Sequence, residues 1–460
     1  MWLNTVSFAI YGLLIAVALV TADNANTTLV YDHVKKNART TFKEPSGHLK
    51  YKYLVPGGPY DQLWDWDSFF MGVAMFEFGS AEYLSGSMKN FLSNTNVTDG
   101  EVQGCLLPSG GTGTIFHARP VIIQGAWLAA KQMNATGLSR AEIMKFKQFQ
   151  PQMKSLLKYW SAPSSVRTDP ITGLPKWYNQ LESGEDNLPL STCASSRSFW
   201  CWNKAYHELK IVSADLSTFL YREYQAYSAF CKAWATHAIG DEARAAHFQE
   251  SKRALLEATK IKDALNKYLW KEEYGYYVAL NTTKSPPLSR AEDGEVDPVT
   301  GYLVVNNRVD VMGFPLMAKD IASADQVKTI RNQLFKPDML SSYGVRSTSS
   351  NDPRYNNKNE IKPYSNWQGP VWVNVNAVLS YGFMRYSAKG SKLEEDAAEI
   401  ANRVVNTLAE DLRRTQTWHE GYDSENGLGL AANGFLSWDT LSAAWQQNLK
   451  DRRDPFLISP

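Results

Sequence analysis

The chain contains a succession of helical segments joined by loops of unequal length, and this pattern most limits the folds open to it. Apolar residues recur at helical spacing through most of the chain after about residue 65. No strand pattern separates these segments, and neighbouring segments pair as hairpins. The sequence therefore predicts an all-α fold. The expected helices span residues 68–91, 120–133, 139–160, 215–237, 241–269, 308–318, 322–334, 369–386, 392–414 and 437–449.

Repeated helical hairpins can close into a ring or stack as an open solenoid. The chain shows no self-similarity of fixed period, which disfavours the solenoid. No low-complexity linker divides it, so residues 23–460 are expected to form a single domain. Long loops inside one domain are usually functional. Here such loops, rich in Gly, Pro and aromatic residues, are residues 51–66, 100–117, 168–202, 281–307, 341–368 and 418–435.

The first residues have the pattern of an export signal. Residues 7–20 form an apolar run of the length of a signal-peptide core, and Val20 and Ala22 suit cleavage after Ala22. No later apolar run is long enough to span a membrane. We therefore expect residues 1–22 to be removed and the mature chain to be secreted or lumenal, with no membrane partner. The net charge of +1 gives no reason to expect a nucleic-acid partner.

The cysteines and the glycosylation sequons fit this expectation of export. Four cysteines permit two disulfides, and Cys193 with Cys201 is the most natural local pair. Sequons for N-glycosylation occur at Asn26, Asn96, Asn134 and Asn281. The other two cysteines are Cys105 and Cys231. No spacing of Cys, His or Glu matches a metal site and no Gly-rich phosphate loop is present, so neither a metal nor a cofactor is expected.

Three loop segments combine carboxylates with aromatic or turn residues. Residues 64–70 alternate Trp and Asp after Tyr60, residues 182–189 hold three carboxylates beside Gly and Pro, and residues 418–427 mix acids with Trp and Tyr. A fourth segment, residues 364–372, offers indoles and amides. Because the apolar faces of sugar rings stack on aromatic side chains, these loops point to a carbohydrate site.

Glycoside hydrolysis needs two carboxyl groups with different pKa values. One donates a proton to the leaving oxygen, and the other activates water or attacks the anomeric carbon. Such groups sit in unlike environments, as two acidic loops from separate halves of the chain would provide. The residue types alone leave open which acid in each loop reacts.

From residue 51 to residue 445 the order of these segments resembles the (α/α)6-barrel glycosidases related to trehalase, in particular glycoside hydrolase family 63 and its mannosylglycerate and glucosylglycerate hydrolases. The resemblance implies a six-hairpin toroid. It also implies that Asp186, in a Ser-Gly-x-Asp segment, is the general acid and Glu420, in a Glu-x-Tyr segment, the general base. Trehalase-like members often have Trp before the acid, whereas this chain has Glu185. The residues implied to hold the sugar are Tyr60, Trp64, Trp66, Asp67, Gln124, Trp367, Gln368, Gly369 and Trp372.

These observations predict an inverting hydrolase of a small α-mannoside or α-glucoside, with a glycosylglycerate as the first choice. Arg119 and Arg346 are candidates for a glycerate carboxylate, and His117 for a contact with substrate. The alternatives are an α-glucosidase of oligosaccharides, a trehalase-like disaccharide hydrolase, and a barrel that binds glycans without cleaving them. A lyase or epimerase would rely on His or Tyr bases, and the seven His form no cluster in the sequence.

Overall fold

The computed structural model describes residues 25–111, 113, 116–133, 139–178, 180–186, 210–282, 295–306, 308–359 and 365–458. The expected export signal (residues 1–22), Cys193, Cys201 and the sequon at Asn134 lie outside these residues. Residues 25–37 are helical, a helix that the sequence pattern did not predict. The further α-helices are α2 (Asp65–Ala74), α3 (Ala81–Asn94), α4 (Ile122–Gln132), α5 (Ser139–Phe146), α6 (Gln150–Ser161), α7 (Gln180–Ser183), α9 (Ala214–Thr236), α10 (Asp241–Tyr268), α11 (Val309–Gly313), α12 (Ala324–Leu334), α13 (Val373–Tyr386), α14 (Lys392–Thr415) and α15 (Trp445–Lys450).

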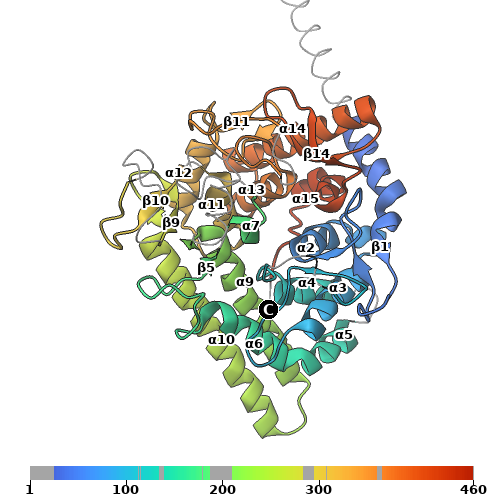
Figure 1. Ribbon diagram of the computed structural model, residues 1–460, viewed down its shortest axis with the longest axis vertical. Helices are drawn as coiled ribbons and strands as arrows, with labels where there is room; N and C mark the ends of the chain where they lie inside the picture. Colours follow the sequence, from blue (N-terminus) through green and yellow to red (C-terminus); the bar gives the residue numbers. More distant parts are fainter. Residues whose placement is uncertain are drawn as a thin grey trace, which may run out of the picture.

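One set of helical segments forms an inner ring. Within the described residues, α2 contacts α4, α4 contacts α9, and α9 contacts α11 and the 3-10 helix η5 (Phe314–Met317). The ring continues through α13 to the 3-10 helix η6 (Ser437–Ala443), which returns to α2 (Figure 1). These segments are buried on all sides; every residue of α13 from Val373 to Met384 is buried. A helix that is buried all round belongs inside a second layer.

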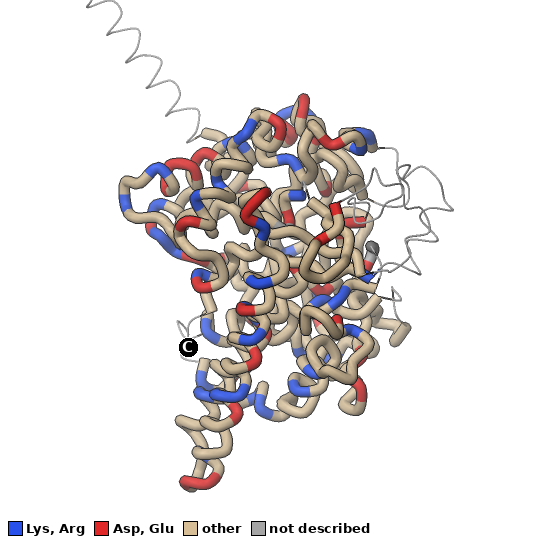
Figure 2. The backbone as a smooth tube through the Cα atoms, turned by 90° about the vertical axis from the view of Figure 1, so that its left-hand side faces the viewer, with Lys and Arg blue, Asp and Glu red and all other residues tan. Residues whose placement is uncertain are grey.

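The outer layer consists of amphipathic helices. In α10, only Ser251, Ala254, Ala258, Ile261 and Leu265 are buried, and they form one stripe that faces α9. The outer helices α12 and α14 likewise pack on α13, whereas α3, which packs on α2 and α4, is the exception because it is buried from Tyr83 to Leu92. On the face seen in Figure 2, basic and acidic residues are interspersed along the tube. The inner and outer helices alternate along the chain, as in the predicted toroid.

Short antiparallel strands lie in the loops between the helices, although the sequence predicted none. β10, β9, β6 and β5 form one sheet in that order, and the other strands pair as β1–β2, β3–β4, β7–β8, β11–β12 and β13–β14. The strands are β1 (Phe42–Lys43), β2 (Tyr53–Leu54), β3 (Leu63–Trp64), β4 (Cys105–Leu106), β5 (Lys176–Trp177), β6 (Ile211–Val212), β7 (Trp270–Lys271), β8 (Tyr276–Tyr277), β9 (Ala279–Asn281), β10 (Leu303–Val305), β11 (Leu340–Ser341), β12 (Gly344–Val345), β13 (His419–Tyr422) and β14 (Gly429–Asn433). Strands of two to five residues are too short to show a reliable period in the sequence.

The predicted helices 139–160, 308–318 and 437–449 each divide into shorter segments, and two further differences have visible reasons. The predicted helix 68–91 divides into α2 and α3 at Gly79, whose φ of 88° ends a helical turn. The predicted helix 369–386 begins only at Val373. Before it, the backbone N–H of Val371 donates to the carbonyl of Tyr422 at 2.7 Å, and the N–H of Tyr422 donates back at 3.0 Å. This pairing keeps Val371 extended and fixes β13 beside the loop that leads into α13.

Two cysteines and two sequons of the expected exported chain can be examined among the described residues. Cys105 and Cys231 are buried free thiols. They do not form one of the two disulfides that four cysteines would permit. Asn281 is only 1% exposed within β9 and cannot carry a glycan in the folded chain, whereas Asn96 is exposed. No helix among the described residues is long and apolar enough to cross a bilayer.

Candidate active site

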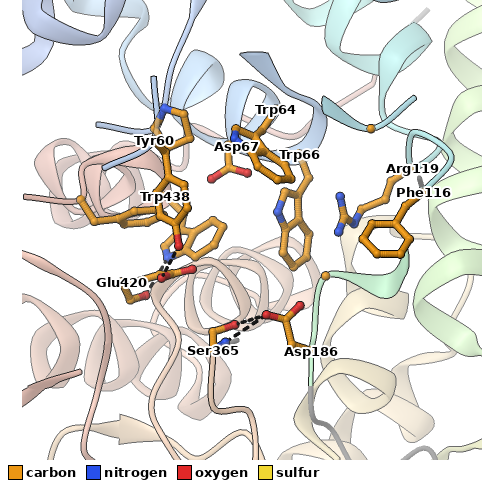
Figure 3. Close-up of a pocket in the computed structure, with 14 residues that line it drawn as sticks. Tyr60, Trp64, Trp66, Asp67, Phe116, Arg119, Asp186, Ser365, Glu420 and Trp438 are labelled. Atoms are coloured by element: carbon orange, nitrogen blue, oxygen red, sulfur yellow. Dashed lines mark hydrogen bonds between the residues drawn. The ribbon is translucent and has the colours of Figure 1, made fainter. Parts of the chain in front are cut away.

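A small cavity lies where the inner segments begin. It encloses about 220 Å³, less than the roughly 300–1,000 Å³ of pockets that bind drug-sized ligands (Figure 3). The amino-terminal ends of α2 and η6 contribute side chains to it, and the positive ends of helix dipoles favour nearby carboxylates. The lining residues are Pro56, Tyr60, Trp64, Trp66, Asp67, Gly104, Phe116, Arg119, Gly184, Asp186, Ser365, Glu420, Phe435 and Trp438.

Glu420 reaches the cavity from a distorted strand. The register of β13 against β14 shifts between His419 and Gly421, so Glu420 lies at a bulge. A bulge turns a side chain away from the regular alternation of a strand. The Tyr60 hydroxyl donates to Glu420 Oε2 at 3.2 Å, and Trp438 Nε1 donates to the backbone carbonyl of Glu420. Burial, together with the charges of Asp186 and Asp67, raises the pKa of Glu420 to about 8.

Asp186 lies on the opposite wall, after the short helix α7 (Figure 3). Its Oδ2 accepts two hydrogen bonds from Ser365, at 3.0 Å from the backbone N–H and at 2.8 Å from the hydroxyl. Burial raises the pKa of Asp186 to about 6, although the two Ser365 donors oppose this increase. Glu185 points the other way: it is 1% exposed and accepts from Arg308 at 3.2 Å. Of these two acids, only Asp186 lines the cavity.

Asp67 is a third carboxyl group on the cavity wall. It makes no capping hydrogen bond at the start of α2, and its Oδ1 accepts from the Ser437 hydroxyl at 2.7 Å. Burial raises the pKa of Asp67 to about 7, and the charge of Asp65 adds to this effect. The Ser437 bond ties the start of α2 to the start of η6 and closes the ring beside the cavity.

Arg119 and Trp66 contact the acid-bearing turn, residues 183–186, which carries Asp186. The Arg119 guanidinium lies 4.4 Å from the centroid of the Trp66 ring and donates to Asp65 at 2.6 Å. Arg119 Nε also donates to the carbonyl of Ser183 at 2.9 Å. The turn that carries Asp186 therefore rests on a fixed cation and a fixed indole.

Five of the predicted sugar-binding residues lie behind the cavity and not on its wall. Gln124 is fully buried, and its Oε1 accepts from Arg222 Nε at 2.7 Å, which joins α4 to α9. Trp367 and Trp372 stack on one another with centroids 4.0 Å apart. Gln368 accepts from Asn356 at 2.8 Å, and the N–H of Gly369 donates to Ser347. The predicted residues that the structure brings together on the wall are Tyr60, Trp64, Trp66, Asp67, Asp186 and Glu420.

Of the three other candidate residues, Arg119, Arg346 and His117, only Arg119 lines the cavity. Arg119 lines the cavity, whereas Arg346 donates to Glu425 at 2.9 Å and to the carbonyl of Pro337. His117 is 3% exposed, and both of its ring nitrogens lie within 3.0 Å of backbone carbonyls. Sequence reasoning missed Phe116, the neighbour of His117, as a lining residue. The remaining missed residues are Pro56, Gly104, Gly184, Ser365, Phe435 and Trp438, most of them within or beside segments already singled out for their aromatic content.

Two carboxyl groups that face one aromatic cavity inside a ring of paired helices place the chain among the (α/α)6-barrel glycoside hydrolases. Sequence comparison narrows this class. Residues 60–438 match the family described as "Mannosylglycerate hydrolase MGH1-like glycoside hydrolase domain", and the chain belongs to that family. The family resemblance inferred from the loop motifs is thereby confirmed.

Individual relatives match shorter stretches. The chain is similar to a probable mannosyl-oligosaccharide glucosidase of Schizosaccharomyces pombe, with 31% identity over 122 residues, 25% of this chain and 14% of that protein. It is also similar to the mannosylglycerate hydrolase of Thermus thermophilus, with 32% identity over 85 residues, 18% of this chain and 17% of that protein. The chain therefore matches less than a fifth of the length of either relative.

A solved structure supports the fold over nearly the whole chain. The neutral trehalase Nth1 of Saccharomyces cerevisiae superposes with a TM-score of 0.59 at 16% sequence identity, covering 89% of this chain and 76% of that one. At this identity the likeness shows a common fold. The all-α toroid predicted from the sequence is therefore confirmed.

Gly184 supplies a test of how tightly the acid-bearing turn is held. Its φ is 83°, and a Cβ there would lie 2.4 Å from Arg119 Nη2 and 2.6 Å from Trp66 Cζ2. We expect Gly184→Ala to displace Asp186 and to lower kcat/KM about 100-fold, the effect of a displacement near 1 Å. Gly173 is the matched control, because its φ of 71° is similar but a Cβ would have no neighbour within 4 Å.

Both alanine variants should lose stability from the left-handed backbone, about 1–2 kcal/mol each. Only Gly184→Ala should lose turnover as well, measured on an aryl α-glycoside beside a thermal unfolding curve. Equal turnover in the two variants would mean that the turn tolerates displacement against Arg119 and Trp66.

Proposed function

We propose that this chain hydrolyses a small α-mannoside or α-glucoside with inversion at the anomeric carbon. The observation that carries the proposal is the placement of Asp186 and Glu420 on opposite walls of one small cavity lined by Tyr60 and Trp rings (Figure 3). Inverting enzymes hold their two carboxyl groups roughly 6.5–9.5 Å apart, which leaves room for a water molecule beside the sugar.

In the proposed reaction, Asp186 gives its proton to the glycosidic oxygen as the bond from that oxygen to the anomeric carbon breaks. Glu420 takes a proton from water, whose oxygen forms the new bond on the opposite face of the ring. The products are an alcohol and a sugar of inverted configuration. Glu420 is then protonated and Asp186 is ionised, so a proton must pass from Glu420 to Asp186 before the next turnover.

The pKa values of Glu420 and Asp186 correspond to this state after turnover. Near neutral pH, Glu420 with a pKa of about 8 holds a proton and Asp186 with a pKa of about 6 is ionised. The two groups interact and titrate together, so the pair carries one proton whichever group holds it. A single shared proton is what an acid–base pair needs, and the assignment of acid to Asp186 and base to Glu420 follows the family motifs.

The cavity size and the family favour a glycosylglycerate as substrate. A volume of about 220 Å³ suits one sugar unit, and the aromatic side chains Trp64, Trp66 and Trp438 offer faces for it. The glycerate carboxylate would meet Arg119, the cation on the cavity wall. An α-glucosidase of oligosaccharides and a trehalase-like hydrolase are the alternatives, in view of the glucosidase and trehalase relatives.

A substrate panel tests the proposal. The chain would be incubated with mannosylglycerate, glucosylglycerate, trehalose, a glucosylated oligosaccharide and the two sugars as aryl α-glycosides, and released sugar would be quantified. We expect the glycerates to give the highest kcat/KM. Binding of these sugars without release of any product would instead identify a glycan-binding barrel, and preference for trehalose or the oligosaccharide would overturn the glycerate assignment.

A further inference from the structure

Beneath the acid-bearing turn lies a buried cluster of three carboxyl groups and one guanidinium. Glu185, Asp215, Asp310 and Arg308 are each at most 1% exposed. Glu185 precedes Asp186, Asp215 lies in the first turn of α9, and Asp310 in the first turn of α11, a helix that contacts α9 (Figure 1). One oxygen from each carboxyl group lies within 4.8 Å of the other two.

Each carboxyl group accepts from at least one N–H donor, and Asp310 accepts on both of its oxygens. Arg308 Nη2 donates to Glu185 Oε2 at 3.2 Å and also contacts Asp310 Oδ2, while its Nε donates to Asp310 Oδ1 at 3.0 Å. Trp177 Nε1 donates to Asp215 Oδ2 at 3.1 Å. Donors of this kind orient carboxylates for a ligand on the other side.

The remaining oxygens of two of these groups lack any donor. Glu185 Oε1 and Asp215 Oδ1 are buried without a hydrogen-bond partner. Arg308 Nη1 also lacks an acceptor, but the bonds on its Nε and Nη2 side hold the guanidinium in place. Buried polar atoms without partners are rare in native proteins and indicate a missing ligand, proton or water.

The charges of the cluster point to a cation. Three carboxylates against one guanidinium leave two negative charges in a buried site, which is strongly unfavourable without compensation. Burial and the nearby carboxylates raise the pKa of Glu185 well above its ordinary range, so protonation could remove one charge. However, a single proton would remove only one of the two negative charges. One divalent cation would be shared by the two oxygens that lack a donor and would compensate both charges.

We propose that Glu185, Asp215 and Asp310 bind one Ca²⁺ ion. Calcium takes oxygen ligands at about 2.3–2.6 Å, so ligands around one ion lie up to about 5 Å apart, whereas Mg²⁺ requires about 2.0–2.1 Å and a tighter cage. The three oxygens lie within 4.8 Å of one another and can reach one ion, and a buried site made of carboxylates favours calcium because Mg²⁺ usually keeps several waters. The ion would join the acid-bearing turn to α9 and α11 and so hold Asp186 in position.

The experiment uses the full chain and measures calcium directly. Protein purified in buffer with Ca²⁺ and then desalted would be analysed for metal content, and its Tm would be measured after EDTA treatment and after return of Ca²⁺ or Mg²⁺. We expect one calcium per chain, a lower Tm in EDTA, and a Tm that recovers and rises with free Ca²⁺ concentration, as linkage requires. Mg²⁺ should restore less of the Tm.

Two variants test whether calcium binds at this cluster and not at another buried carboxylate. Asp215→Asn should abolish both the bound calcium and the response of the Tm. Asp297→Asn is the matched control: Asp297 is equally buried but already bonded to Lys271 and Thr300, so this variant should keep its calcium. If the wild-type chain holds no calcium and its Tm is the same with EDTA and with Ca²⁺, the proposal is wrong. This outcome would leave the glycosidase proposal untouched, because neither measurement depends on activity.

Discussion

Replacement of Glu420 by Gln is expected to reduce hydrolysis of the best α-glycoside by about 10²- to 10⁴-fold, because the amide cannot accept a proton from the attacking water. KM should change little, since the amide keeps the size of the side chain and can still accept from Tyr60. Steady-state kinetics on the best substrate of the panel would measure both constants. Turnover within a few-fold of wild type would rule out Glu420 as the base.

Glu425→Gln is the matched control for this substitution. Glu425 lies five residues further along the same segment, but its carboxylate binds Arg346 and does not line the cavity. The fold of Glu420→Gln can be checked by its Tm. The raised pKa of Glu420 means that the wild-type chain loses stability as pH rises from about 4.5 towards 8, because the buried carboxyl must then ionise. Gln carries no such penalty, so the variant should be at least as stable as wild type at pH 8.

Replacement of Asp186 by Asn is expected to have a comparable effect on ordinary glycosides, about 10²- to 10⁴-fold, but not on a glycosyl fluoride. Fluoride leaves without protonation, so an enzyme that lacks only its general acid still cleaves it. Rates on an alkyl α-glycoside and on the matching α-fluoride would be compared in Asp186→Asn and in Glu420→Gln.

The comparison assigns the two roles. Asp186→Asn should keep most of its rate on the fluoride, whereas Glu420→Gln should lose both activities, because both reactions need the base. The reverse pattern would make Glu420 the acid, as its higher pKa would suggest. Loss of fluoride cleavage in both variants would contradict an acid role for Asp186.

Much of the fold could be predicted from the sequence because it depends on local patterns. The single buried stripe of α10 and the largely apolar sequence of α13 are examples of patterns that fit an outer and an inner helix. The long acidic and aromatic loops correctly marked the segments that meet at the cavity. The family motifs then selected Asp186 and Glu420, both of which line it.

The remaining features depend on contacts between distant residues. The bulge that turns Glu420 inward exists because β13 pairs with β14 and with Val371, and none of these short strands has a periodic signature. Trp367 and Trp372 looked like sugar platforms, yet they stack on each other behind the wall. Glu185, Asp215 and Asp310 come from three elements that are far apart in the sequence. Their spacing therefore does not predict the cluster.

The configuration of the first sugar released tests most directly whether Asp186 and Glu420 act as an inverting pair. Proton NMR would follow the anomeric signal of the product during the first minutes of hydrolysis of the best α-mannoside or α-glucoside, before mutarotation mixes the anomers. Water activated by Glu420 on the face opposite the leaving group must give the β-anomer first. Initial release of the α-anomer would contradict that mechanism and require a covalent intermediate or a different pair of residues.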